Sequence, residues 1–127
     1  MDYKIVTNNN KVFNFFKETD NVVYLEGYNI EKVLNFIEQK CLEGHRLLSD
    51  PILYNLENLD NPFKSILITD KQIEDNTHSI KIIVGVLDII KKVNFTPKEV
   101  QDEISLEEFR FVDLNLIRDS ITKISLL

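Results

Sequence analysis

The sequence predicts an α/β domain with a small, mostly parallel, four-stranded sheet flanked by helices in a Rossmann-like plan, followed by a helical C-terminal extension. Two observations support this prediction. Short runs rich in β-branched residues alternate with stretches in which apolar residues recur every three or four positions. Strands separated by helices are usually parallel and joined by right-handed crossovers. The 127 residues suit one domain over 1–127, with 95–127 as its helical extension.

The first half of the chain alternates strand and helix in this way. We expect strands at 3–7 (YKIVT) and 21–26 (NVVYLE), with a short helix over 11–18 (KVFNFFKE) between them. The apolar residues that follow have helical spacing and predict an amphipathic helix. This helix begins after Asn29, which can cap its N-terminus, and ends before Gly44, which suits a left-handed C-terminal cap.

The second half contains two further predicted strands, at 45–51 (HRLLSDP) and 64–69 (KSILIT), separated by a loop. The next segment, 79–93 (SIKIIVGVLDIIKKV), is apolar enough for a buried strand. Its polar residues and its glycine recur at spacings of four, three and four, as on one narrow stripe of a helix. We therefore predict a helix that is buried over most of its circumference, with this stripe exposed: Lys81, Gly85, Asp88 and Lys92.

The C-terminal extension contains two helix-start patterns. Thr96 is followed by proline and then by Glu99, and Ser105 is followed three positions later by Glu108. In both cases a hydroxyl side chain can cap the helix while the glutamate bonds back to the cap. Apolar residues at helical spacing continue to the end of the chain, so we expect terminal helices here.

Composition argues against several functions. The net charge of −6 disfavours binding to nucleic acid or to an anionic membrane surface, because both depend on lysine and arginine. A single cysteine, Cys41, excludes an internal disulfide and fits a reducing compartment. The longest nearly apolar run, 82–90, is too short to cross a bilayer, and the first ten residues lack the apolar core of a signal peptide. A soluble cytoplasmic protein is expected.

In an open parallel sheet, ligands bind beyond the carboxyl ends of the strands. The turns expected there carry hydroxyl, amide, imidazole and basic side chains, which could together hold a small anion. This predicted ligand site comprises Thr7, Asn8, Asn9, His45, Arg46 and Lys64. The turn after the first strand lacks the glycines of a phosphate-binding loop, and ordinary turn and capping chemistry is the favoured explanation of its asparagines.

These residues allow other interpretations. His45 could act as a base oriented by Asp50, with a serine such as Ser49 or Ser65 as nucleophile, or it could be purely structural. Cys41 lies four residues before His45, but two ligands fall short of a zinc site, so we predict no metal and no cofactor. No catalytic residue is assigned, and whether the protein is an enzyme stays open.

Three segments carry a resemblance to a known family. They are Thr7-Asn8-Asn9, Gly44-His45-Arg46-Leu47-Leu48 and Pro62-Phe63-Lys64-Ser65, and they resemble the GrdX family over most of residues 3–93. Asp50 stands where the family pattern has a second histidine. The resemblance implies a setting in anaerobic bacteria, beside the glycine reductase complex of amino-acid fermentation, and implies no biochemical activity.

Two functional hypotheses follow. The first is a non-enzymatic accessory or interaction protein of glycine reductase-type fermentation, with reductase components as partners and homo-oligomerisation. The apolar segment 80–90 is either core or, as its next interpretation, a dimer interface. The second hypothesis is a protein or enzyme that binds a small anionic metabolite at the carboxyl ends of the parallel strands.

Overall fold

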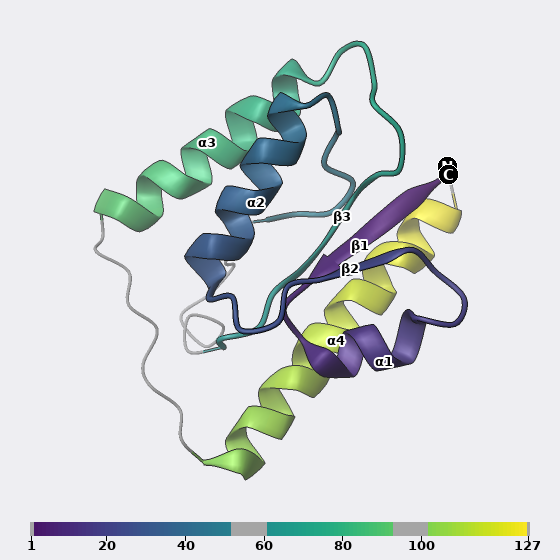
Figure 1. Ribbon diagram of the computed structural model, residues 1–127, viewed down its shortest axis with the longest axis vertical. Coiled ribbons are helices and arrows are strands. Elements are labelled where there is room, and N and C mark those ends of the chain that lie inside the picture. The colour runs from purple at the N-terminus through teal and green to yellow at the C-terminus, as the bar shows by residue number, and fades with distance from the viewer. Residues whose placement is uncertain (1, 52–60, 93–101, 127) are drawn as a thin grey trace.

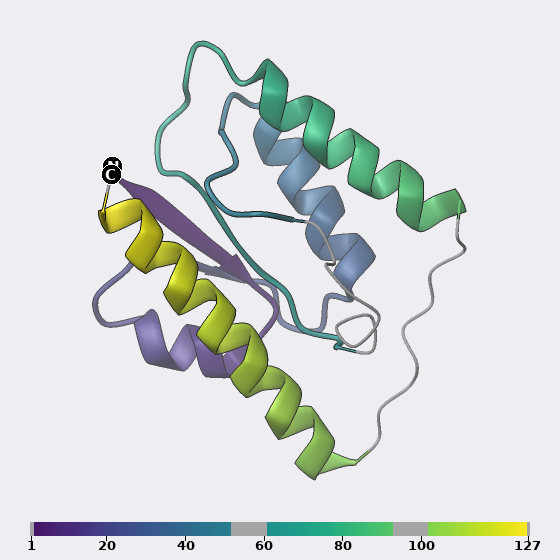
Figure 2. The same cartoon turned by 180° about the vertical axis from the view of Figure 1, so that it is seen from behind.

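The structure is a computed structural model that describes residues 2–51, 61–92 and 102–126. A sheet forms the middle of three layers, with α2 and α3 on one face and α1 and α4 on the other (Figures 1 and 2). In chain order the elements are β1 (Tyr3–Thr7), α1 (Asn10–Phe16), β2 (Val22–Tyr24), α2 (Ile30–Leu42), β3 (Ser65–Thr69), α3 (Thr77–Lys92) and α4 (Glu103–Ser125).

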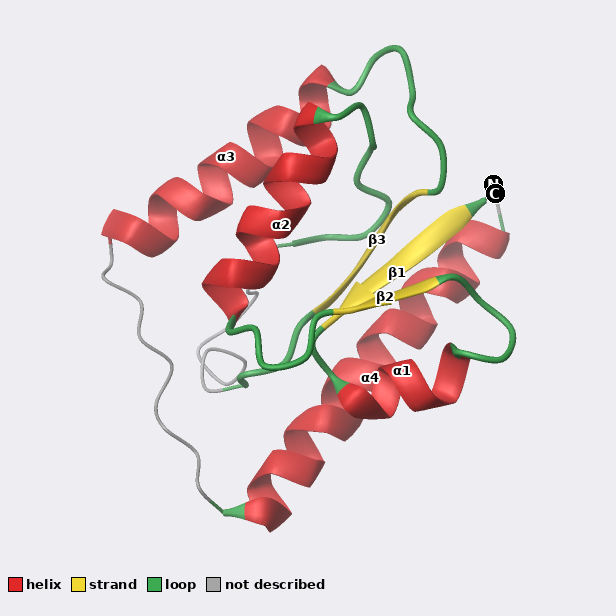
Figure 3. Ribbon diagram, viewed as in Figure 1, coloured by secondary structure: helices red, strands yellow, loops and turns green. Residues whose placement is uncertain are grey.

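The sheet has three strands in the order β2-β1-β3, with β1 at its centre (Figure 3). β1 pairs with β2 in parallel, from Ile5 opposite Val22 onward. β1 pairs with β3 in the antiparallel direction over its whole length, with Thr7 opposite Ser65. The carboxyl ends of β1 and β2 therefore lie at the same edge of the sheet as the amino end of β3.

The prediction of a four-stranded, mostly parallel, Rossmann-like sheet is wrong, because the observed sheet has three strands and is mixed. Segment 45–51, expected to be a strand, contributes only an isolated antiparallel bridge between Leu47 and Ile68. β3 is antiparallel because no helix pattern lies between 45–51 and β3. A strand reached without a crossover helix can fold back beside its predecessor, whereas a parallel strand needs the longer crossover.

The helices follow the predicted patterns closely. Asn29 caps α2 by accepting a hydrogen bond from the backbone of Lys32, and Gly44 follows the helix with a φ of 113°. A helix runs through the segment of α3, as predicted, and its polar stripe is exposed. The expectation that this helix is buried over most of its circumference is wrong, because one apolar face packs on α2 while Val84 and Ile89 remain exposed.

Two hydrophobic clusters lie on opposite faces of the sheet, because alternate strand residues point in opposite directions. Val6 and Ile68 belong to the cluster beneath α2 and α3. Ile5 and Leu67 belong to the cluster beneath α1 and α4. The central strand therefore contributes to both cores, so the two faces depend on the same backbone.

α4 completes the second of these clusters through Leu114 and Ile117. It begins after Asp102, whose side chain caps it, and Ser105 lies inside the helix instead of at its start. The other predicted start, at Thr96, lies outside the described residues. Among the described parts of the chain, the structure contains no helix that is both long enough and apolar enough to span a membrane.

Candidate functional site

The structure divides the six predicted site residues between the two ends of the sheet. Thr7, Asn8, Asn9 and Lys64 meet where β1 ends and β3 begins. His45 and Arg46 lie at the other end of β3, where both contact Thr69. The four residue steps of β3 separate the two groups by roughly 13 Å. Four of the six residues are brought together, because the antiparallel direction of β3 places Lys64 beside the end of β1. His45 and Arg46 begin a segment that runs antiparallel to β3, and so in the direction of β1, which places them at the opposite end of the sheet.

Asn8 joins three segments at this end of the sheet. Its amide nitrogen donates to the carbonyl oxygens of Tyr28 and Pro62, at 2.8 and 3.0 Å. Its amide oxygen accepts from the backbone N–H of Lys64 at 2.8 Å. Both donor hydrogens and the acceptor of the side chain are engaged within the protein, so Asn8 holds the loop before β3 against the turn after β1.

Asn9 connects α1 to α4. Its amide oxygen caps α1 by accepting from the backbone N–H of Lys11, at 3.0 Å. Its amide nitrogen donates to the carbonyl of Arg110 at 2.9 Å and to the carboxylate of Asp113 at 3.0 Å. Asparagine is favoured at a helix N-cap because its side chain satisfies a free backbone donor. Here the same side chain also secures a helix about a hundred residues later in the sequence.

Asp113 is the central residue of this region, although it is not among the six predicted site residues. Only 3% of its surface is exposed, and its carboxylate accepts from the backbone and the hydroxyl of Ser65, at 3.0 and 2.7 Å, as well as from Asn9. The sequence did contain a pointer, since Asp113 interrupts the buried face of α4 next to Leu114 and four positions before Ile117. We call Thr7, Asn9, Ser65 and Asp113 the polar clasp.

The hydroxyls of the clasp form an ordered chain. Ser65 donates its single hydroxyl proton to the Asp113 carboxylate. The hydroxyls of Thr7 and Ser65 are 2.6 Å apart, so Thr7 donates to Ser65, while the backbone N–H of Asn9 donates to Thr7. Every clasp group thus has a defined partner, as buried polar groups require.

The charges around the clasp influence one another. Burial raises the pKa of Asp113, against the opposing effects of the hydrogen bonds from Ser65 and Asn9 and of the Lys64 ammonium. Burial lowers the pKa of Lys64, against the opposing effects of Asp113 and Asp50. Desolvation is the largest cause of both pKa shifts, so the charged groups of Lys64 and Asp113 are largely shielded from water.

A polar cavity of about 120 Å³ adjoins the clasp, between the start of β3 and the C-terminal half of α4. Lys64, Ser65 and Asp113 form part of its wall, and Leu116 and Ile117 supply its apolar part. The rest of the lining comes from Ser49, Asp50, Asp119, Ser120 and Lys123. Of the predicted ligand residues, only Lys64 lines this cavity, and whether the others contact a ligand stays a prediction.

His45 makes a backbone contact at the opposite end of the sheet. It is buried, and its Nδ1 lies 2.8 Å from the carbonyl oxygen of Thr69, so Nδ1 carries the proton of that hydrogen bond. The backbone of Arg46 donates to the Thr69 hydroxyl, and its guanidinium donates to the carbonyl of Asp75. A catalytic pairing of His45 with Ser65 is excluded, because Ser65 lies at the other end of β3.

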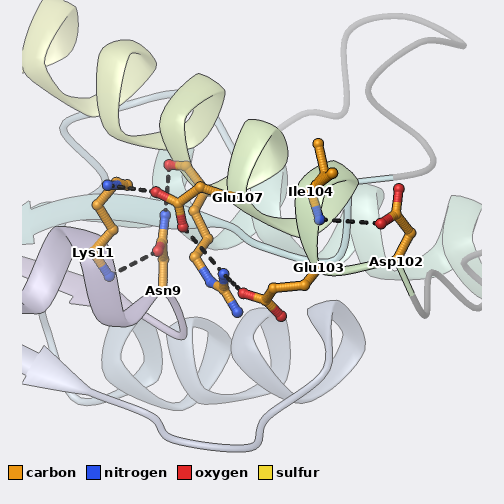
Figure 4. A network of polar contacts seen from close by, with 7 residues as sticks. Asn9, Lys11, Asp102, Glu103, Ile104 and Glu107 are labelled. Carbon is orange, nitrogen blue, oxygen red and sulfur yellow. Dashed lines mark hydrogen bonds and ion pairs between the residues drawn. The ribbon is translucent and has the colours of Figure 1, made fainter.

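One ion pair joins the start of α4 to α1, between Lys11 and Glu107 at 2.6 Å (Figure 4). Within α4, Arg110 pairs with Glu103 at 2.7 Å and with Glu107 at 3.2 Å. The Arg110 guanidinium also lies over the ring of Phe63. Exposed ion pairs contribute little stability individually, so the Lys11–Glu107 pair adds only modestly to the contact between the two helices.

One face of α4 is not covered by any of the described residues. Ile104, Phe111, Val112 and Leu116 lie at helical spacing and form what we call the α4 stripe. Ile104 is 73% exposed and Phe111 55% exposed, unusual values for a large apolar side chain. An open depression of about 770 Å³ runs along the stripe and is edged by Glu103, Glu107 and Glu108.

Comparison with known proteins identifies a matching family. The family model described as GrdX-like protein matches residues 4–122, nearly the whole chain, including α4. No curated protein and no solved structure matches the sequence.

Proposed function

Because this chain belongs to the GrdX-like protein family, we propose that it is an accessory protein of a glycine reductase-type amino-acid fermentation system, acting in the cytoplasm by contact with another protein. The partner in this proposal is a component of the reductase. The choice of a reductase component as partner rests on membership of the family, and the choice of a contact surface rests on the fold.

The observation that carries the proposal is the α4 stripe. Large apolar side chains on a single helix face normally pack against another element, and contiguous exposed apolar surface on a soluble domain marks an interaction site. Phe111 stands near the middle of the stripe, and aromatic residues at the centre of an interface supply much of its binding energy. The stripe therefore suits the apolar groove or helix of a protein partner.

The rim of the stripe indicates the charge of that partner. Glu103 and Glu107 are paired with Lys11 and Arg110, while Glu108 forms no ion pair with any described residue. The edge is acidic, in keeping with the net charge of −6. Complementary charges across an interface favour encounter and specificity, so the docking surface on the reductase component should be apolar with a basic rim.

The test is direct binding between this protein and purified components of glycine reductase, measured by interferometry at several salt concentrations. The wild-type chain should bind one component, and binding should weaken as salt rises because the rim charges are screened. Phe111→Asp should reduce affinity by at least about a hundred-fold, since it places a charge at the centre of the interface.

The matched control is Leu42→Asp, which places the same charge on an apolar residue that is 60% exposed at the end of α2. This variant should bind as the wild type does. Equal loss of binding in both variants, or no binding of the wild type to any purified component, would overturn the proposal.

Self-association is the second part of the proposal. Val84 and Ile89 project from α3 and remain exposed after α3 has packed on α2, with Ile89 61% exposed. These residues are the surface we assign to a homo-oligomer. Light scattering after size-exclusion chromatography should give more than one chain per particle, and Ile89→Asp should shift the mass toward the monomer. A monomeric wild type would contradict the proposed self-association. The binding experiment above would still decide the proposed contact with the reductase.

A further inference from the structure

The cavity beside Lys64 has walls with charges of both signs. Lys64 and Lys123 supply ammonium groups, and Asp50 and Asp119 supply carboxylates. Ser49 and Ser120 add hydroxyl oxygens. A site for a simple anion would collect positive charge, as arginine and lysine clusters do. This cavity is balanced instead, so a ligand with only one charge would meet a like charge on the opposite wall.

The positions of these groups give the cavity a direction. Lys64 lies at the inner end, next to the buried clasp, and among the described residues no carboxylate is within 4 Å of its ammonium. Asp119 and Lys123 lie on the exposed side of α4, at the mouth. The Asp113 carboxylate already accepts three hydrogen bonds from Ser65 and Asn9. Each end also has charge of the other sign, because Asp50 and Asp113 act on Lys64 and Lys123 lies beside Asp119 at the mouth. Lys64 is the ammonium group nearest the clasp and Asp119 is the carboxylate at the mouth, so a ligand can place an anionic group on Lys64 and a cationic group on Asp119.

The hydroxyls support the same direction. Ser49 accepts a hydrogen bond from the backbone of Leu67, and a hydroxyl that accepts also carries one proton that it can donate. Ser120 donates to the carbonyl of Leu116, and its oxygen retains the capacity to accept. Ser49 can therefore help Lys64 to bind an anionic group, while Ser120 can help Asp119 to bind a cationic group.

The volume of the cavity limits the size of the ligand. Each water in the liquid takes roughly 30 Å³, so the 120 Å³ of this cavity corresponds to a few waters or to a molecule of about five or six heavy atoms. Leu116 and Ile117 leave a short apolar wall between the two polar ends. We propose that this cavity is a binding site for a small zwitterion, an amino acid no larger than alanine or β-alanine, with its carboxylate on Lys64 and its ammonium on Asp119.

This site shares Leu116 with the α4 stripe, but its ligand is a small molecule, whereas the stripe takes a protein partner. Its test needs only the purified full-length chain and no reductase component. Failure of either proposal therefore leaves the other standing.

The experiment is calorimetric titration of the protein with glycine, β-alanine, acetate, methylammonium and inorganic phosphate. Glycine or β-alanine should bind, while acetate and methylammonium, which each carry half of the charge pattern, should bind at least about ten-fold more weakly. If acetate or phosphate binds as well as the amino acids, the site is an anion site and the proposal is overturned. Absence of binding by both amino acids also overturns it.

Variants locate the binding. Lys64→Met should weaken amino-acid binding by at least about ten-fold, because it removes the donor at the inner end. Asp119→Asn is the second variant, since it is exposed and should fold normally, and it should weaken binding of the amino acids more than that of acetate. Lys91→Met, at the exposed end of α3, is the matched control and should bind as the wild type does. Unchanged binding in both Lys64→Met and Asp119→Asn would place the ligand elsewhere and overturn the proposal.

Discussion

At the residue scale, the turn after β1 shows how small polar side chains can be engaged in hydrogen bonds within the protein. The sequence singled out Thr7, Asn8 and Asn9 correctly as a concentration of hydrogen-bonding groups, but it could not show what they bond. Their partners, Asp113 and Ser65 among them, are distant along the chain and meet the turn only in the folded protein. Asp113 escaped notice because a single carboxylate on a helix face resembles a solvent-exposed one.

Asp113→Asn should lower the free energy of unfolding by about 1–3 kcal/mol, because the new amide N–H₂ would face the donating amide of Asn9 and leave buried groups unsatisfied. Urea denaturation measures the change. Asp119→Asn, on the exposed side of the same helix, is the control and should alter stability by no more than about 0.5 kcal/mol. Equal effects of the two substitutions would argue against the clasp.

Cys41 gives a prediction with a pH dependence. Burial raises the pKa of its thiol to about 11, with a smaller contribution from Glu38. A group whose pKa is higher in the folded than in the unfolded state contributes stability that is present below the unfolded pKa and lost as pH rises through the folded pKa. The wild type should therefore lose stability more steeply than Cys41→Ala between about pH 9 and pH 11. Parallel slopes in chemical denaturation would contradict this.

At the element scale, helices were predictable and strand direction was not. Apolar periodicity and caps depend on neighbouring residues, so α2 and α3 could be placed from local sequence alone. The direction of β3 depends on how the chain returns after Leu47, which local patterns do not encode. The lack of a helix pattern between 45–51 and β3 indicated that these two segments run in opposite directions, because two strands without a crossover between them tend to pair antiparallel.

Two glycines make a matched test of local backbone requirements. Gly44→Ala should destabilise the protein by about 1–2 kcal/mol, because the left-handed φ of 113° is costly for a residue with a Cβ, and that Cβ would lie 3.1 Å from Gln72. Gly85→Ala should stabilise it by about 0.5–1 kcal/mol, since Gly85 is inside α3 with open space around it. Thermal unfolding of both variants measures the contrast, and a destabilising Gly85→Ala would contradict the assignment of α3.

At the scale of the whole molecule, the sheet is shared by two cores and α4 closes the second one. The sequence predicted a helical C-terminus but not the face it covers, since that depends on tertiary contacts such as the bond from Asn9 to Arg110. The six predicted site residues separated into two groups for a similar reason, since local patterns do not show at which end of the sheet a turn lies. The antiparallel direction of β3 brings Lys64 to the turn after β1, whereas His45 and Arg46 start a segment that runs in the direction of β1 and so lie at the other end.

Neighbouring residues on α4 test this role. Ile117→Ala should destabilise the chain by about 2–5 kcal/mol, because Ile117 is buried against Ile5 and Leu67 and its loss leaves a cavity. Leu116→Ala should change stability by only about 0.5 kcal/mol, because Leu116 is 44% exposed. Denaturant unfolding compares them, and similar losses in the two variants would mean that α4 packs differently.

The two edges of the sheet have a consequence for aggregation. β2 spans only three residues, so it presents a very short row of unpaired backbone groups. The outer side of β3 is occupied by the segment before it, with Leu48 donating to Leu67 and Thr69 donating to Arg46. Exposed strand edges are the usual templates for uncontrolled β-pairing between molecules. With one edge short and the other occupied, this chain should resist fibril growth by strand addition.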